Sequence, residues 1–173
     1  MNEHVPGTAA SRAANGAAAS RQPGQYLTFM LGGEVFAVGI LSIKEILEYR
    51  SMTEVPMMDP CIRGVINLRG SAVPVMDLAL RFGKPSSPVG KRTCIVILEV
   101  EGDEAHRLFG VVVDAVNEVV EIAQADVEPP PDFSARIGSG FIQGIGKIND
   151  RFVILLQVDR IMNPGGADPG PIS

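Results

Sequence analysis

The chain has 173 residues, of which 46% are hydrophobic and 20% are charged, and its formal net charge is −5. This length allows one domain or two small subdomains around a shared core. Nucleic-acid binding relies on clustered positive charge, so the scattered Lys and Arg residues argue against it. No apolar run reaches the roughly 18 residues that cross a bilayer, and no apolar stretch near the N-terminus resembles a signal peptide. We therefore expect a soluble cytoplasmic protein without direct membrane insertion.

The two ends of the chain differ in composition from its middle. Residues 1–23 are rich in Ala, Gly and Ser, and residues 163–173 are rich in Pro and Gly. Neither stretch offers large apolar side chains to a core, and Pro and Gly do not sustain a helix or strand. We expect flexible tails at 1–23 and 163–173 and one ordered domain, built of two subdomains, over residues 24–162.

The ordered part begins with a predicted β-hairpin. Leu27, Phe29 and Leu31 share one face of a strand that ends at Gly32-Gly33, and apolar residues alternate again after this pair. A Gly-Gly dipeptide suits a tight turn in which both residues have positive φ.

A helix is predicted next, over "SIKEILEY" at residues 42–49. Ser42 is followed three residues later by Glu45, which is the spacing of a capping box. Ile43, Ile46 and Leu47 would then share one apolar helical face.

Three further hairpins are predicted from pairs of alternating strands: "GVINLRGSAVPVM" turning at Arg69-Gly70, "RTCIVILEVEGDEAHRLFGVVVDAV" turning near Gly102-Asp103, and "FIQGIGKINDRFVILLQV" turning at Asn149-Asp150. Short helices are predicted at "DLALRFG", from an Asp77 N-cap to Gly83, and at "QVDRIM". Three consecutive prolines make "VEPPPDFSARIGSG" a surface loop. Several short strands joined by tight turns favour a small barrel or sandwich over an alternating α/β fold.

The sequence contains no recognisable catalytic or cofactor-binding set. His4 and His106 have no ligand-spaced partner, and Cys61 and Cys94 are expected to be free buried thiols. "GSGFIQGIGK" lacks the glycine and hydroxyl positions of a phosphate-binding loop, so its glycines are expected to relieve crowding in a curved strand. We expect no metal, no cofactor and no enzymatic activity, and a protein that works through its surface.

A ligand-binding or hydrolytic barrel is the alternative from another class. Such a protein needs polar groups that converge on a pocket. Asp114, His106 and Lys147 are the residues that would have to line it.

The stretch "IRGVINLRGSAVPVMDL" resembles the CheW family, the adaptors of bacterial chemotaxis arrays. "YLTFMLGGEVFAVGILSIKEI", "FGVVVDAVNEVVEI", "PPPDF" and "GFIQGIGKINDRFVILLQVDRIM" resemble family segments in the same order, over roughly residues 25–162. The resemblance implies a mainly β fold of two intertwined, five-stranded, SH3-like β-barrels. It also implies a non-enzymatic adaptor that links the cytoplasmic tip of methyl-accepting chemoreceptors to the C-terminal barrel domain of a CheA-type histidine kinase. An adaptor of another chemosensory pathway, such as twitching motility or second-messenger control, stays open as the alternative.

Carried over by motif, the resemblance assigns the receptor and kinase coupling surface to Arg69 of "NLRG", with Asn67 and Leu68 beside it, and receptor coupling to Ile43 and Glu45 of "SIKEI". Gly64 of "IRGV" and Val119 of "VNEVV" match further partner-binding positions.

Each of these positions also has a structural interpretation. Arg69 is a solvated charge at a turn by position alone, although its planar fork suits bidentate recognition. Glu45 closes the predicted capping box. Ile43 and Val119 read as core residues from their apolar neighbours, and Gly64 indicates a close approach of two backbones.

Overall fold

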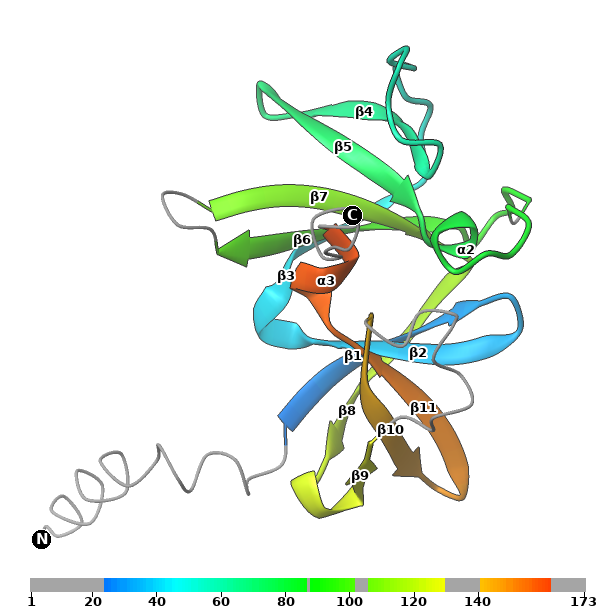
Figure 1. Cartoon of the computed structure of the whole chain (residues 1–173), viewed down its shortest axis with the longest axis vertical. Helices are drawn as coiled ribbons and strands as arrows, with labels where there is room; N and C mark the ends of the chain where they lie inside the picture. The colour runs from blue at the N-terminus through cyan, green and yellow to red at the C-terminus, as the bar shows by residue number, and fades with distance from the viewer. Residues whose placement is uncertain (1–23, 87, 102–105, 130–140, 163–173) are drawn as a thin grey trace, which may run out of the picture.

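The computed structural model describes residues 24–86, 88–101, 106–129 and 141–162 (Figure 1). The predicted tails, the turn at Gly102-Asp103, His4 and residues 130–140 of the predicted loop lie outside these ranges. The described strands form two sheets, one of six strands and one of five.

The six-stranded sheet has the order β8-β1-β2-β11-β10-β9. Its strands are β1 (Gly24–Leu31), β2 (Glu34–Gly39), β8 (Ala115–Ile122), β9 (Val127–Glu128), β10 (Ile142–Ile148) and β11 (Arg151–Leu156). The five-stranded sheet has the order β3-β6-β7-β5-β4. Its strands are β3 (Ile43–Glu48), β4 (Ile62–Leu68), β5 (Ser71–Asp77), β6 (Cys94–Glu101) and β7 (His106–Val113). The helical pieces are η1 (Ile40–Ser42), α2 (Leu78–Arg81), η2 (Gln124–Asp126) and α3 (Val158–Met162).

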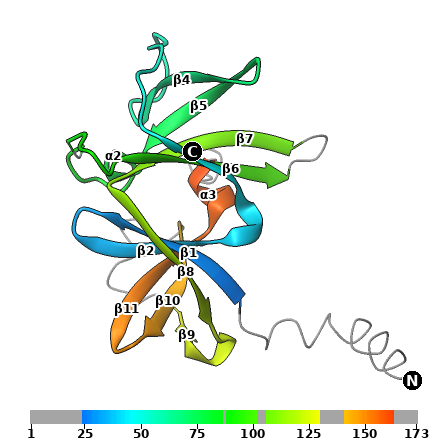
Figure 2. The ribbon, with the colours of Figure 1, turned by 180° about the vertical axis from the view of Figure 1, so that it is seen from behind.

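The chain starts in the first barrel, builds the second, and returns to complete the first. β1 and β2 belong to the six-stranded sheet, β3 to β7 make the five-stranded sheet, and β8 to β11 join β1 and β2 again. Figure 2 shows the chain crossing back from β7 into β8 between the two sheets. This path confirms the expected mainly β fold of two intertwined SH3-like barrels; the sixth strand of the first barrel is the two-residue β9.

The backbone beyond β3 closes the second barrel, because β3 and β4 are the edges of its sheet. The Thr53 N–H donates to the Val65 carbonyl at 3.0 Å, and the Val65 N–H donates to the Thr53 carbonyl at 2.8 Å. This exchange satisfies backbone groups of β4 that an open sheet edge would leave unpaired.

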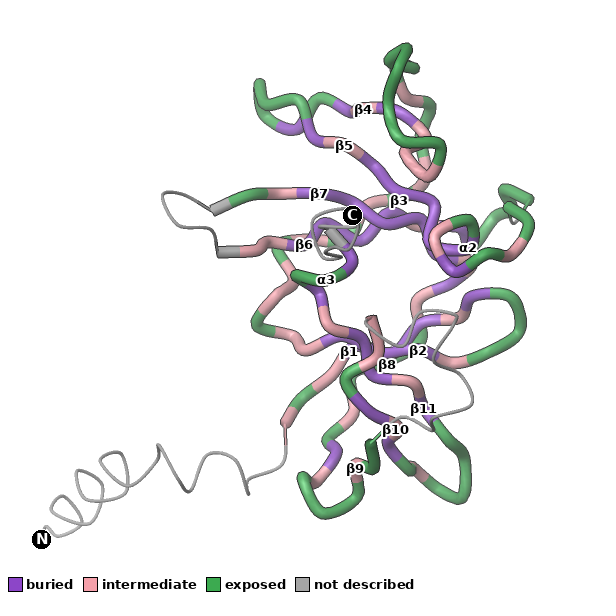
Figure 3. The backbone as a smooth tube through the Cα atoms, in the orientation of Figure 1, coloured by how far each residue is buried: buried purple, intermediate pink, exposed green. Residues whose placement is uncertain are grey.

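The main hydrophobic core lies at the seam between the barrels. It combines buried residues of β1, β2, β6 and β7 with residues of α2 and α3, while smaller clusters fill each barrel. Figure 3 shows the buried segments gathered in the middle of the molecule and the exposed ones at the hairpin tips. Burying each large apolar side chain stabilises the fold by roughly 1.5–3 kcal/mol, so the seam holds the two barrels together.

A row of aromatic rings crosses this seam. The ring centroids of Phe29 and Phe36 lie 6.1 Å apart, those of Phe36 and Phe82 lie 5.4 Å apart, and those of Phe82 and Phe141 lie 6.0 Å apart. The Arg81 guanidinium lies 4.2 Å from the centroid of Phe141, which is a cation–π contact. Phe82, just after α2, thereby anchors the second barrel on the first.

The predicted turns adopt the expected backbone. Gly32 and Gly33 have φ values of 61° and 85°, and Asn149 and Asp150 have values of 50° and 67°. Both residues of each pair are in the left-handed region that two-residue hairpin turns require. The predicted helix at Asp77 and the final helical turns of α3 are also confirmed.

The predicted helix over residues 42–49 is wrong, because Ile43–Glu48 form strand β3. Ser42 ends the single turn of η1 instead of starting a helix. Half-buried and exposed residues alternate along β3, and its backbone pairs with β6. The spacing of the apolar residues fits both the helical period and the strand period, and the hydrogen bonds offered by β6 favour the strand.

The predicted loop over residues 127–140 is corrected at its start, where Val127–Glu128 form β9 against β10. A Cβ on Gly144 would lie 2.7 Å from the Val127 side chain and 2.8 Å from the Glu128 carbonyl. Only glycine lets β9 approach β10 this closely, which agrees with the expectation that these glycines relieve crowding.

Candidate protein-binding surfaces

The β4–β5 turn presents Arg69 in a fixed conformation. Arg69 and Gly70 have φ values of 52° and 89°, and the Asn67 Oδ1 accepts a hydrogen bond from the Gly70 N–H at 2.8 Å. The Asn67 carbonyl accepts a further bond from Arg50 at 3.4 Å. Leu68 is only 7% exposed and packs in the second barrel. Asn67 and Leu68 therefore hold the turn from its two sides, and Arg69 projects from it.

Arg69 has an acidic partner that lies far away in sequence. Its Nη2 lies 2.7 Å from the Glu45 Oε1, and this ion pair connects the β4–β5 turn with the edge strand β3. The Arg69 side chain is 70% exposed, whereas that of Glu45 is 24% exposed. Exposed pairs contribute only about 0–1 kcal/mol to stability. The pair therefore orients the arginine more than it stabilises the fold.

Gly64 lies where the barrel closes. A Cβ at this position would stand 2.6 Å from the Thr53 carbonyl oxygen and 2.9 Å from the Met52 Cβ. This supports the interpretation of Gly64 as a close backbone approach, with an indirect effect on the neighbouring turn.

We expect Gly64→Ala to lower the free energy of unfolding by roughly 1–3 kcal/mol, because the new methyl group must displace the backbone of Thr53. Urea denaturation followed by circular dichroism measures the loss. Gly90→Ala is the matched control, since a Cβ at Gly90 meets nothing within 4 Å. Equal stabilities of the two variants would contradict this role of Gly64.

Ile43 and Val119 lie in different environments. Ile43 is half-buried and packs against the seam core, as the core interpretation predicts. Val119 is 52% exposed on the edge strand β8, so the core interpretation of this residue is wrong. Val119 is therefore available to a partner, whereas Ile43 contributes mainly to packing.

Strand β8 contains a β-bulge directly before Val119. The register between β1 and β8 shifts between Leu27 and Phe29, so that two residues of β8 stand opposite Thr28. Thr28 is 4% exposed; its Oγ1 donates to the Glu118 carbonyl at 2.8 Å and accepts from the Glu118 N–H at 3.2 Å. The hydroxyl replaces the ladder bonds that the bulge interrupts.

We expect Thr28→Val to lower the free energy of unfolding by about 1–3 kcal/mol, because it leaves the Glu118 peptide groups without their partner. Amide hydrogen exchange at Glu118 should accelerate more than at neighbouring strand residues. Thr28→Ser keeps the hydroxyl and should retain most of the protection. If the serine variant exchanged as fast as the valine variant, the hydroxyl would not hold the bulge.

A groove of two adjoining hollows lies beside η1, where both sheets meet. The larger hollow has a volume of about 670 Å³ and is lined by residues of β1, β8, β10 and the segment before α3. The smaller has about 430 Å³ and reaches β6. Leu41 and Val158 line both, and Leu41 is 97% exposed. We call this region the Leu41 groove.

Three exposed apolar side chains were not predicted from the sequence, namely Leu41, Met57 at 100% exposure and Phe152 at 66% exposure. Leu41 directly follows the alternating apolar residues of β2 and breaks their alternation. This break is the signal that could have identified Leu41 as an exposed residue. Met57 has a φ of 69°, which is unusual for a residue with a side chain. Neither Met57 nor Phe152 breaks the sequence pattern around it.

A buried polar network supports the base of the β4–β5 hairpin. Asp77 is 2% exposed; it accepts from Arg63 Nε at 3.0 Å, from the Leu80 N–H at 3.2 Å and from the Ser86 hydroxyl. Arg63 also donates to the Tyr49 hydroxyl at 2.8 Å. The carboxylate thus caps α2, as predicted, and also ties β4 to the loop that follows α2.

Other polar and sulfur-containing residues have structural surroundings. Asp114, named in the ligand-pocket alternative, accepts the Gly32 N–H at 2.8 Å, and Lys147 is on β10. Cys61 and Cys94 are free and half-buried, and burial raises the pKa of both thiols. Among the described residues, no group of three His, Cys, Asp or Glu side chains could hold a metal ion. No helix in the described ranges is long and apolar enough to cross a membrane.

Two fused small β-barrels, with an oriented arginine at one hairpin tip and an exposed leucine in a groove, define the class: a scaffold built to present surfaces to other proteins. A family model described as the CheW-like domain matches residues 25–164. The chain belongs to the CheW family, whose members are non-catalytic adaptors of chemotaxis.

Relatives and a solved structure agree with this assignment. The chain is 33% identical over 138 residues to the chemotaxis protein CheW of Helicobacter pylori, covering 80% of this chain and 81% of that protein. It is 29% identical over 139 residues to CheW of Klebsiella aerogenes, covering 80% and 81%. The crystal structure of the scaffolding protein TtCheW from Thermoanaerobacter tengcongensis matches with a TM-score of 0.75 and 33% identity, covering 85% of this chain and 92% of that one.

Proposed function

We propose that this protein is a cytoplasmic adaptor that couples chemoreceptors to a CheA-type histidine kinase and catalyses no reaction itself. It is recruited to membrane-associated receptor arrays by binding both partners. The observation that carries the proposal is the Arg69 turn, which is held by Asn67 and Glu45 while the Arg69 side chain remains 70% exposed.

The kinase's C-terminal barrel domain binds the end of the second barrel that carries the Arg69 turn. Arg69 supplies a planar fork of donors for carboxylates or backbone carbonyls of the partner. Ile46, 44% exposed, lies on the same edge strand as Glu45 and adds exposed apolar area to this edge of the second barrel. Arginine is one of the residue types enriched in binding hot spots.

The receptor's helical cytoplasmic tip binds the Leu41 groove. An exposed leucine in a hollow of this size suits the apolar stripe of an amphipathic helix. Val119, exposed on β8, lies on the strand that also supplies Glu121 to the groove. The two partners then occupy different surfaces, one at the Arg69 turn and the other at the groove where both sheets meet, which allows both to bind at once.

Each contact is expected to be weak by itself. Interfaces near or below about 1,600 Å² with few anchors fit an assembly that must switch. For one isolated pair of partners, we therefore expect a dissociation constant near the micromolar range, which corresponds to a binding free energy of about −8 kcal/mol. Multivalency then strengthens the whole array.

A titration tests the proposal. The labelled full chain is titrated with the kinase barrel domain, with a receptor cytoplasmic fragment, and with both together. We expect saturable binding of each partner and a ternary complex. Leu41→Ser should weaken only receptor binding, while Phe152→Ser, an equally apolar but distant exposed position, should weaken neither. Failure of the wild-type chain to bind either partner would refute the proposal.

The alternative of an adaptor in another chemosensory pathway is not favoured, because the relatives described above are named chemotaxis proteins.

A further inference from the structure

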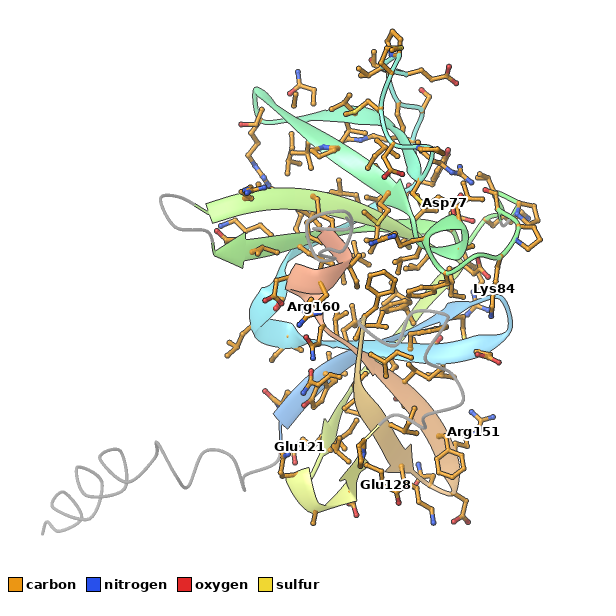
Figure 4. All side chains as sticks on the ribbon, in the orientation of Figure 1. Asp77, Lys84, Glu121, Glu128, Arg151 and Arg160 are labelled. Atoms are coloured by element: carbon orange, nitrogen blue, oxygen red, sulfur yellow. The ribbon has the colours of Figure 1, made fainter. Side chains whose placement is uncertain are left out.

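The Leu41 groove has an acidic lining. Glu121 lines the larger hollow, Glu99 lines the smaller one, and Asp159 lines both. Among the described residues that line either hollow, none is Lys, Arg or His. Figure 4 labels Glu121 on the first barrel and Arg160 on α3. Arg160 follows Asp159 in sequence but lines neither hollow.

The apolar part of the groove is organised around a single protruding residue. Leu41 belongs to both hollows and is 97% exposed, so it stands between them. The half-buried Ile40 and the buried Leu156 and Val158 line the larger hollow beside it. A partner must therefore offer an apolar stripe to Leu41 and polar groups to the carboxylates on either side, which is the pattern of an amphipathic helix.

We propose that the Leu41 groove selects a helical segment whose apolar stripe is flanked by Lys or Arg, and that Glu121 and Asp159 determine this selectivity. The inference rests on the proposed function, because it assigns a charge to the receptor segment that occupies the groove. A segment with acidic flanks is rejected, because its carboxylates would lie opposite the carboxylates of the groove. None of the described residues that line the groove is basic, so none could offset this repulsion.

The selectivity should depend on salt. Both carboxylates are at a solvent-accessible surface, where ionic strength screens their field within about 10 Å at 0.1 M salt. Complementary charges of this kind act mainly on the association rate. The preference should therefore be large at low salt and small at high salt, whereas the apolar contact with Leu41 should persist.

Two synthetic helical hairpin peptides with the same apolar stripe test the proposal, one flanked by Lys and the other by Glu. Binding to the full chain is measured by fluorescence anisotropy. We expect the Lys peptide to bind at least about 10-fold more tightly at low salt, and the ratio to fall to about 2 near 0.5 M salt. The double variant Glu121→Lys/Asp159→Lys should prefer the Glu peptide. Glu128→Lys, an exposed charge change on β9, is the matched control and should keep the wild-type preference.

The outcomes separate this inference from the proposed function. Equal affinities for the two peptides, binding of neither, or an unchanged preference in the double variant would overturn the charge selectivity. Circular dichroism of each variant establishes that it is folded. The receptor cytoplasmic fragment is then titrated in parallel. If it does not bind the wild-type chain, the proposed function fails; if it binds the wild type and the double variant equally, only the charge selectivity fails.

Discussion

Arg69→Glu is expected to weaken binding of the kinase barrel domain by roughly 30- to 1,000-fold, which corresponds to about 2–4 kcal/mol for the loss of an interface anchor. The substitution removes the donors of the guanidinium and places a second carboxylate beside Glu45, which now lies 2.7 Å from Arg69. The fold should hardly change, because an exposed pair contributes only about 0–1 kcal/mol to stability. Isothermal titration and a thermal melt measure the two effects separately.

Two controls determine what the loss means. Arg151→Glu makes the same charge change at another exposed hairpin position, on the first barrel, and should leave kinase binding intact. The swapped pair Glu45→Arg/Arg69→Glu restores an ion pair with the arginine on β3. If the swapped pair recovered full kinase binding, only the presence of an ion pair would matter. We expect kinase binding to stay weak, because the arginine no longer projects from the turn. A large drop in melting temperature for Arg69→Glu would make Arg69 a structural residue.

Asp77→Ala is expected to lower the free energy of unfolding by about 3–5 kcal/mol, the typical cost of removing one partner of a buried ion pair. Asp77 is 2% exposed and receives hydrogen bonds from Arg63, the Leu80 N–H and the Ser86 hydroxyl. Its loss leaves the largely buried Arg63 guanidinium without this carboxylate and α2 without its N-cap. Urea denaturation of the purified variant measures the effect.

Asp59→Ala serves as the matched control for Asp77. Asp59 also accepts a local backbone hydrogen bond, from the Cys61 N–H at 2.8 Å, but it is exposed and forms no ion pair among the described residues. We expect it to cost less than about 1 kcal/mol, as one exposed hydrogen bond does. Similar losses for the two variants would show that the Asp77 network does not stabilise the base of the β4–β5 hairpin beyond an ordinary turn contact.

The regular parts of the fold were predictable because local and global preferences agree. Turn pairs such as Gly32-Gly33 and Asn149-Asp150 adopt positive φ, and the strands after them bury the apolar residues Phe36, Val38, Val153 and Leu155. Asp77 forms the predicted cap. In each of these segments, the local preference of the chain and the packing of the barrel require the same conformation.

The secondary-structure prediction failed where the spacing of apolar residues in one segment suits both a helix and a strand. The apolar residues of 43–48 suit one helical face, but neighbouring β6 pairs with five of these six residues. Glu45 therefore points toward Arg69 and closes no capping box. Val119 is a second case, since its apolar neighbours indicate core while the residue is 52% exposed on the edge strand β8. An edge strand lacks a neighbour on one side, and the local sequence does not reveal which strand is the edge.

By itself the sequence determined the class of fold, the positions of the turns and the membership of a family, because these depend on short-range patterns and on residue types in order. Only the tertiary structure decided which distant residues meet: Arg69 with Glu45 across the barrel end, Thr53 over Gly64 where the barrel closes, and Leu41 with Glu121 and Asp159 in one groove. These contacts join segments that are adjacent only after both barrels have closed. Their geometry is set by strand register and bulges, which arise from the packing of the whole chain.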